Sequence, residues 1–166
     1  MTIIATDLDG TIYKGQTLID GVKNGVLEII NAGIEIYFTT NNSSQSPNEI
    51  KDKLDNLLQL NLDMTKIITP LVIFQSLYSG SNKDIYIYGS DNLKNFIKKL
   101  NMNVTNLENA ELILIGRKEE NNNSEINQIL KNVSLGKEIL CLNKDLTFPT
   151  ELEERPGNGA VVKIIE

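Results

Sequence analysis

Residues Thr2 to Tyr13 read TIIATDLDGTIY, and the rest of the chain is organised around this stretch. Its first part is apolar and rich in β-branched residues without polar alternation, which predicts a strand at 2–6 that is buried on both faces of a parallel sheet. Side chains alternate along a strand, so Asp7 and Asp9 are expected on one side. Because open α/β sheets bind ligands at the carboxyl ends of their strands, we expect a small acidic site here.

The two residues after the acid pair suit a turn that binds a ligand. Gly10 permits a sharp turn because it has no Cβ, and Thr11 offers a hydroxyl and an amide to whatever the carboxylates hold. The alternative is an ordinary Asp-Gly turn after a strand, since such dipeptides are common in turns. A turn has no need of two converging aspartates, so we favour the site.

The composition of the 166 residues narrows the possible functions. The chain has 22 acidic and 16 basic residues, a net charge of −6 and no dense basic stripe, so nucleic acid is not an expected partner. No apolar run approaches the roughly 20 residues of a membrane span, which favours a cytoplasmic protein without a membrane partner. One cysteine, Cys141, excludes an internal disulfide and fits a reducing compartment.

Histidine is absent from the sequence. Its absence excludes Ser-His-Asp and Cys-His hydrolases, histidine phosphatases and zinc sites with histidine ligands. Any chemistry must therefore come from carboxylates, hydroxyl groups, lysine or a hard metal ion held by oxygen atoms.

Strand and helix patterns alternate over the first 80 residues. Asp20 is expected to cap the first helix, and Ser46 with Glu49 forms a capping box for the second. The expected strands are 2–6, 34–39 and 66–68, and a third helix is expected from Pro70 to about Gly80. This alternation predicts parallel connections and an α/β sheet.

The pattern restarts after residue 80. Ser90 and Ser124 are expected to cap helices, and Pro156 is expected to begin the last helix. The expected strands are 84–88, 112–115 and 138–142. The sequence therefore predicts one unit at 1–80 and a second α/β unit at 81–166.

A second polar cluster, Thr40-Asn41-Asn42-Ser43-Ser44, follows the expected strand at 34–39. It stands at the carboxyl end of that strand, as the acid pair does at the end of the first. A loop that is merely solvated is the alternative, but the cluster supports a shared site at this edge of the sheet.

With both motifs in hand, the chain resembles the haloacid dehalogenase (HAD) superfamily of phosphatases, in particular the branch with NagD, p-nitrophenylphosphatase and phosphoglycolate phosphatase. DLDGT at 7–11 is similar to the first motif of the superfamily, and TNNSS at 40–44 to the second. The other matches, in the same order, are ITP at 68–70, IYG at 87–89, NKDLTFP at 143–149 and PGNGA at 156–160. The resemblance implies the N-terminal half of a Rossmann-like parallel-sheet core, at 1–80, followed by an α/β cap domain at 81–166.

The resemblance also implies roles for the residues of both motifs. Asp7 is similar to the nucleophile that takes the phosphoryl group as an aspartyl-phosphate, and Asp9 to the general acid and base. Two unit charges at 4 Å repel by about 4 kcal/mol at an effective dielectric constant near 20, so Mg²⁺ is implied as a cofactor bound by Asp7 and Asp9. The residues implied in phosphate binding are Gly10, Thr11, Thr40, Asn41 and Asn42.

The substrate is expected to be a small phosphorylated metabolite. Asp145 is similar to a residue in the family's substrate-facing loop, and a surface turn is the alternative reading. The sequence Gly116-Arg117-Lys118 departs from the many relatives with an acidic residue after the cap strand, so substrates do not transfer from those relatives. The oligomeric state is open, a homo-oligomer included.

Two motifs of the superfamily have no counterpart in the sequence: a lysine that binds the phosphoryl group, and an acidic pair that completes the Mg²⁺ site. The strand that would flank 2–6 is also expected to be absent, which leaves 2–6 at a sheet edge. We therefore expect a fragment or split product of a Mg²⁺-dependent phosphatase, with little activity of its own.

Two other functions stay open. One is a complete short protein that binds a phosphorylated ligand or a partner without catalysis, for which Asp9 would have no evident use. The other is a phosphosugar mutase or a dehalogenase on the same scaffold, which the TNNSS motif and the type of cap disfavour.

Overall fold

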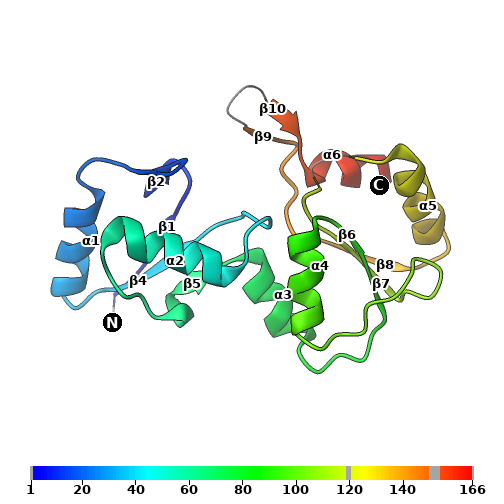
Figure 1. The fold of residues 1–166 in the computed structure, drawn as a ribbon, viewed down its shortest axis with the longest axis horizontal. Helices are drawn as coiled ribbons and strands as arrows, with labels where there is room; N and C mark the ends of the chain where they lie inside the picture. Colours follow the sequence, from blue (N-terminus) through cyan, green and yellow to red (C-terminus); the bar gives the residue numbers. More distant parts are fainter. Residues whose placement is uncertain (1, 119–120, 150–153, 166) are drawn as a thin grey trace. The chain divides into compact units, whose positions relative to one another are not determined.

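The computed structural model describes residues 2–118, 121–149 and 154–165, and the chain divides into two compact units, Met1–Ile73 and Phe74–Glu166 (Figure 1). The division falls within helix α3 (Pro70–Tyr78), and the sequence pattern placed a domain boundary near Gly80, just after this helix. In the described ranges, no helix combines the length and the apolar composition that crossing a bilayer requires.

The first unit contains a parallel sheet of three strands in the order β1-β4-β5. The strands are β1 (Ile3–Asp7), β4 (Glu35–Thr39) and β5 (Ile67–Ile68). They confirm the predicted parallel α/β arrangement. The register aligns Asp7 with Thr39, so β1 and β4 end side by side.

Two helices cover one face of this sheet, where the core of the first unit lies. Helix α1 (Val22–Asn31) contacts β4, and α2 (Pro47–Leu58) contacts β5. The core combines Leu8, which follows β1, with alternate residues of β4 and apolar positions of both helices: Val26, Ile36, Phe38, Ile50, Leu54 and Leu58. In α2 the buried positions recur at helical spacing, at Ile50, Leu54 and Leu58.

The caps of these helices were predicted with mixed success. The capping box is confirmed, because the Ser46 side chain accepts from the Glu49 amide and the Glu49 carboxylate accepts from the Ser46 amide at 2.7 Å. The predicted cap by Asp20 is wrong, since α1 begins after Gly21 without a side-chain cap. A short hairpin of β2 (Tyr13–Lys14) and β3 (Thr17–Leu18) and a 3₁₀ turn at Met64–Lys66 complete the unit.

Strand β1 is an edge strand, as the resemblance implied. Its residues alternate between exposed and half-buried, and 57% of Ile3 is exposed. The prediction that this strand is buried on both faces is therefore wrong for this chain. The apolar composition of 2–6 was read correctly as a strand, but burial depends on neighbouring layers that sequence periodicity does not count.

The second unit contains another parallel sheet, in the order β6-β7-β8. Its strands are β6 (Ile85–Tyr88), β7 (Leu112–Ile115) and β8 (Glu138–Cys141). Its helices are α4 (Asp91–Lys99), α5 (Asn123–Ser134) and α6 (Asn158–Ile165). Every residue of β7 is buried, so both faces of this sheet are covered.

Two predicted helix starts in the second unit meet different outcomes. Ser90 caps α4, because its side chain accepts from the amide of Leu93. Ser124 is not the cap of α5, since the Asn122 side chain accepts from the amides at 124 and 125. Asparagine and serine both cap well, so sequence alone did not decide between neighbouring candidates.

Pro156 does not begin a helix, contrary to the prediction. It ends β10 (Glu154–Pro156), which pairs with β9 (Thr147–Pro149) in an antiparallel hairpin, and α6 begins two positions later. The amides of Gly157 and Gly159 donate to the carbonyls of Leu146 and Asp145 at 2.8 and 3.0 Å. A Cβ on either glycine would collide with the backbone at 144–146, so the NKDLTFP and PGNGA segments depend on each other for close packing.

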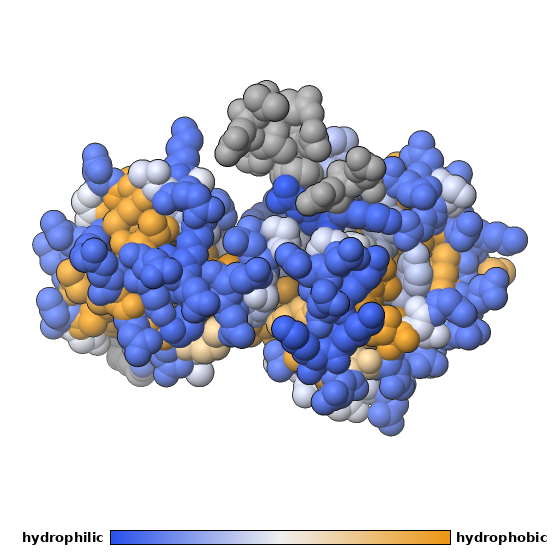
Figure 2. Space-filling view, viewed as in Figure 1, coloured by the Kyte–Doolittle hydropathy of each residue, from blue (hydrophilic) through white to orange (hydrophobic). Residues whose placement is uncertain are grey.

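Apolar side chains reach the surface of both units among hydrophilic neighbours (Figure 2). The large ones that are exposed are Ile3, Ile30, Ile73, Leu77, Val104, Leu135, Leu146 and Ile164. Single exposed apolar residues are common on protein surfaces. Among the exposed apolar residues that the structure describes, Ile3 is the one that lies in an edge strand.

Candidate active site

The acid pair stands at the carboxyl end of β1. Asp7 is the last residue of that strand and Asp9 follows its end, and both are exposed. Leu8 between them is fully buried in the core, which confirms the predicted alternation. The structure thus presents two carboxylates at the ligand-binding edge of a parallel sheet.

The turn after the acid pair is held by backbone hydrogen bonds. Gly10 has a φ of 84°, a conformation that favours glycine, and its amide donates to the Tyr13 carbonyl at 2.8 Å. The amides of Thr11, Ile12 and Tyr13 all donate to the Leu8 carbonyl. The Thr11 amide is therefore engaged within the turn, and the exposed hydroxyl is the group through which Thr11 can meet a ligand.

Asp9 has an environment that suits proton transfer. Burial raises the pKa of its carboxyl group, and the Asp7 charge raises it further, whereas Lys53 and a hydrogen bond from Tyr13 oppose the rise. A carboxylic acid with a raised pKa keeps its proton up to a pH closer to neutral. The raised pKa therefore suits Asp9 to the role of proton donor. Burial and the same two carboxylates also raise the pKa of the Tyr13 hydroxyl, which stays protonated as a donor.

The second motif forms an ordered loop at the end of β4. Thr40 is buried, its amide donates to the Ile68 carbonyl at 3.0 Å, and its Oγ1 accepts from the Asn42 amide at 3.1 Å. The Asn42 Oδ1 accepts from both the amide and the hydroxyl of Ser44, at 2.8 and 2.7 Å. The loop is thus folded by its own side chains, and the Thr40 hydroxyl keeps a proton to donate.

The structure brings together the residues of the first and second motifs. Because Asp7 aligns with Thr39, the acid pair and the Thr40 loop follow adjacent strands, which lie about 4.8 Å apart in a sheet. Asn41 is exposed in this loop. Binding of a phosphate by the Gly10, Thr11, Thr40, Asn41 and Asn42 positions stays a prediction.

Asp145 belongs to the second unit, in the loop after β8. It is exposed, and its side chain accepts from the Asn143 side-chain amide at 3.1 Å, which stabilises a local turn. A role for Asp145 in choosing the substrate stays a prediction.

Sequence reasoning missed two residues of the site, Tyr13 and Lys53. The Lys53 Nζ lies 3.5 Å from the centre of the Tyr13 ring, and both groups interact electrostatically or by hydrogen bonding with Asp9. A signal was present, because Lys53 lies three residues after Ile50 and next to Leu54, on the apolar side of α2. A lysine at such a position needs a partner, which here is the ring and the acid.

The donor set fits a hard cation in part. In the residues that the structure describes, no group of three or more acidic or cysteine side chains is placed to hold a metal ion. Mg²⁺ is commonly bound through one or two carboxylates together with water and substrate phosphate oxygens. The Asp7 carboxylate and the backbone carbonyl of Asp9 supply oxygen ligands, so the two residues are compatible with Mg²⁺ without forming a complete protein cage.

Two proteins of similar sequence are acid sugar phosphatases. The acid sugar phosphatase of Staphylococcus epidermidis is 27% identical over 161 residues, which covers 96% of this chain and 62% of that protein. The acid sugar phosphatase of Staphylococcus haemolyticus is 28% identical over 163 residues, with 96% and 61% covered. The chain therefore spans about three fifths of the length of these curated relatives.

Solved structures share the fold over nearly the whole chain. A p-nitrophenyl phosphatase from Archaeoglobus fulgidus has a TM-score of 0.88 at 22% identity, covering 99% of this chain and 63% of that one. NagD from Escherichia coli K-12 has a TM-score of 0.81 at 18% identity, with 99% and 64% covered. The glycerol phosphate phosphatase of Mycobacterium tuberculosis, solved with magnesium, has a TM-score of 0.80 at 22% identity, with 99% and 50% covered.

The sequence pattern of one family matches residues 4–103, which is more than half of the chain and includes the acid pair, the Thr40 loop and the start of the second unit. This match agrees with the motifs and with the fold of the NagD and p-nitrophenyl phosphatase structures. The chain belongs to the family of haloacid dehalogenase-like hydrolases.

Proposed function

We propose that the chain carries the nucleophile and the proton-transfer group of a Mg²⁺-dependent phosphomonoester hydrolase in the cytoplasm. The observation that carries the proposal is the pair of exposed carboxylates at the end of β1, one of which, Asp9, has a raised pKa. The names of the relatives, which are acid sugar and p-nitrophenyl phosphatases, support a small phosphorylated metabolite such as a sugar phosphate as the substrate.

The two carboxylates divide the reaction between them. An Asp7 oxygen attacks phosphorus as the bond to the leaving oxygen breaks, and Asp9 gives its proton to the departing alcohol. Asp9 then takes a proton from water as the water oxygen attacks phosphorus, which releases phosphate and restores the Asp7 carboxylate. The Thr40 hydroxyl is suited to donate to a phosphoryl oxygen, where negative charge develops.

Mg²⁺ would be held by the Asp7 carboxylate and by the backbone carbonyl of Asp9. When bound, it would offset the repulsion between the nucleophile and the phosphate dianion. Since the described residues supply no third acidic ligand, we also propose that the 166-residue chain has little turnover by itself. The second unit, in this proposal, corresponds to the cap domain of the family, and Asp145 contributes to substrate choice.

Fluoride complexes that mimic a phosphoryl group test the proposed chemistry. Beryllium or aluminium fluoride with Mg²⁺ should raise the thermal stability of the chain, and a ligand at 100 times its Kd would add about 2.7 kcal/mol. Asp7→Asn should abolish the gain. Asp20→Asn is the matched control, because Asp20 is exposed in the same unit and caps no helix, and it should keep the gain.

A binding protein without catalysis is the second candidate, favoured by the small number of acidic ligands among the described residues. Such a protein would be stabilised by inorganic phosphate with or without Mg²⁺, and Asp7→Asn would leave that effect intact. Mg²⁺-dependent turnover of p-nitrophenyl phosphate that disappears in Asp7→Asn would instead confirm the hydrolase and contradict the low activity that we propose for the chain.

A further inference from the structure

Tyr13 and Lys53 connect helix α2 to the acid pair. Tyr13 begins β2, four residues after Asp9, and only 1% of it is exposed. A β-bridge pairs Asp9 with Tyr13, and the Tyr13 hydroxyl interacts with the Asp9 carboxylate. The Lys53 ammonium lies 3.5 Å from the centre of the Tyr13 ring. The ring therefore stands between a cation and an acid.

Burying the charged ammonium group of Lys53 costs free energy unless a partner compensates for the lost water. Lys53 lies on the apolar side of α2 and is half-buried, and this burial lowers the pKa of its ammonium group while Asp9 opposes the change. A cation over an aromatic face is attracted by the electrons of the ring, which offsets part of the cost of burial. The ring then has little freedom to move, because the core holds one side and Lys53 holds the other.

A similar triad in the same unit shows what a purely structural arrangement looks like. The Lys66 Nζ lies 4.3 Å from the centre of the Tyr37 ring, and the Tyr37 hydroxyl donates to Glu35 at 3.1 Å. Lys66 also pairs directly with Glu35, at 2.7 Å. That triad ties β4 to the 3₁₀ turn and lies at the start of β4, the end of the strand opposite to the Thr40 loop.

We propose that Tyr13 and Lys53 are positioning residues for Asp9: the hydroxyl holds the carboxylate in one orientation, and Lys53 holds the ring that carries the hydroxyl. This inference rests on the proposed role of Asp9 in proton transfer. Proton transfer needs the donor within hydrogen-bonding reach of the leaving oxygen, and a misplacement of about 1 Å can cost about 100-fold in rate. The pair would thus fix the general acid before a substrate arrives.

The test measures the orientation of the Asp9 side chain directly by NMR on the full 166-residue chain. Three-bond couplings to the Asp9 carboxyl carbon report whether χ1 occupies one rotamer or averages over several. The wild type should show one rotamer. Tyr13→Phe and Lys53→Met should both show averaging, and Lys53→Arg should restore the single rotamer, because arginine also stacks on aromatic faces.

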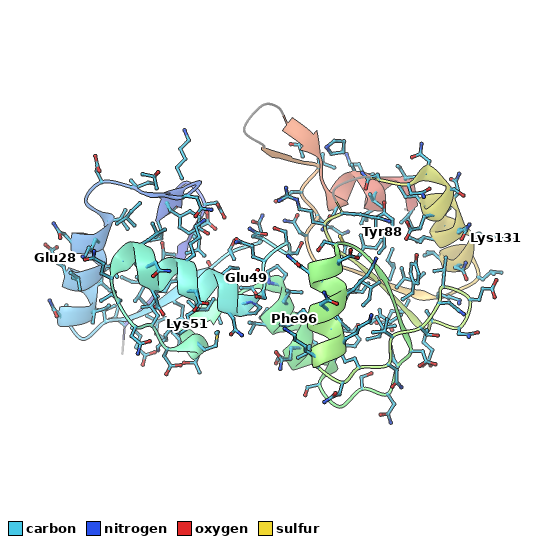
Figure 3. The ribbon with its side chains drawn as sticks, viewed as in Figure 1. Glu28, Glu49, Lys51, Tyr88, Phe96 and Lys131 are labelled. Carbon is cyan, nitrogen blue, oxygen red and sulfur yellow. The ribbon has the colours of Figure 1, made fainter. Side chains whose placement is uncertain are left out.

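Lys51→Met is the matched control on the same helix. Lys51 pairs with Asp55 at 2.5 Å, it is labelled on α2 in Figure 3, and its loss should leave the Asp9 rotamer unchanged. Amide spectra identify any variant that fails to fold, and Lys53→Met with Lys53→Arg decides the question if Tyr13→Phe does not fold. A single unchanged rotamer in Lys53→Met and Tyr13→Phe would overturn the proposal.

A second measurement separates positioning from a merely structural role. Aluminium fluoride imitates the transferring phosphoryl group together with the attacking water, whereas beryllium fluoride imitates the aspartyl-phosphate alone. Lys53→Met should weaken the first complex at least tenfold more than the second, and a purely structural residue would weaken both alike. If neither fluoride stabilises the wild type while Asp9 still shows one locked rotamer, the proposed function fails and the positioning stands.

Discussion

Each of the two units contains a parallel sheet of three strands, yet the strands of the two sheets differ in burial. All four residues of the central strand β7 are buried, whereas β1 alternates between exposed and half-buried residues at the edge of its sheet. The strand with the acid pair is thus the less protected of the two. Apolar β-branched sequence specifies a strand in both units, but only neighbouring layers make the strand a core element.

Truncating a buried side chain of the central strand β7 should have the largest effect on stability. Leu114→Ala removes a fully buried side chain from β7, and we expect it to destabilise the second unit by about 2 to 5 kcal/mol. Ile3→Ala removes a largely exposed side chain from β1 and should cost the first unit less than about 1 kcal/mol. Amide hydrogen exchange in each unit measures both values, and equal losses would show that β1 is covered in solution.

Replacing one glycine in each unit should have an intermediate effect on stability, and the two losses extend the comparison between the units. Gly159→Ala drives a Cβ into the Lys144 carbonyl, so the backbone must shift, and we expect a loss of about 1 to 3 kcal/mol in the second unit. Gly10→Ala meets no atom within 4 Å but is strained by its φ of 84°, and about 1 kcal/mol is expected in the first unit. Urea unfolding measures these losses, and the reverse order would contradict the packing of 144–146 against Gly157 and Gly159.

Acid should produce the smallest effect, and Glu125 is the group in the second unit through which we test it. Burial acts to raise the pKa of Glu125, but hydrogen bonds from Lys118 and Tyr86 prevail and lower it below the ordinary 4.5. The stability that Glu125 contributes is therefore complete above pH 4.5 and is lost as the pH falls through the lower pKa of the folded state. Glu125→Gln should flatten the pH dependence of urea unfolding in this range.

Glu28→Gln serves as the control for this measurement. Glu28 is an exposed residue of α1, labelled in Figure 3, and its replacement should leave the acid dependence as it is in the wild type. An unchanged slope in Glu125→Gln would contradict the assigned network of Lys118, Tyr86 and Glu125.

Much of the site could be predicted because its residues are local in sequence. Asp7 and Asp9 follow a recognisable strand, and Thr40 follows the next one, so the alternation of side chains and the parallel connection suffice to bring them to one edge. Helix α2 could also be predicted, because its capping box and its apolar residues lie in one short contiguous segment. The two cap predictions that failed are Asp20 and Ser124. Gly21 takes the cap position of α1 in place of Asp20, and Asn122, which caps as well as serine, takes that of α5.

The amino-acid sequence by itself determined the family, the parallel strands and the acid pair, because motifs, periodicity and capping are properties of short contiguous segments. Only the tertiary structure decided that the residues of β1 alternate between exposed and half-buried, that Pro156 ends a hairpin strand, and that Lys53 stacks on Tyr13 beside Asp9. These features arise from contacts between distant segments, whose energies depend on burial and geometry that no local pattern records.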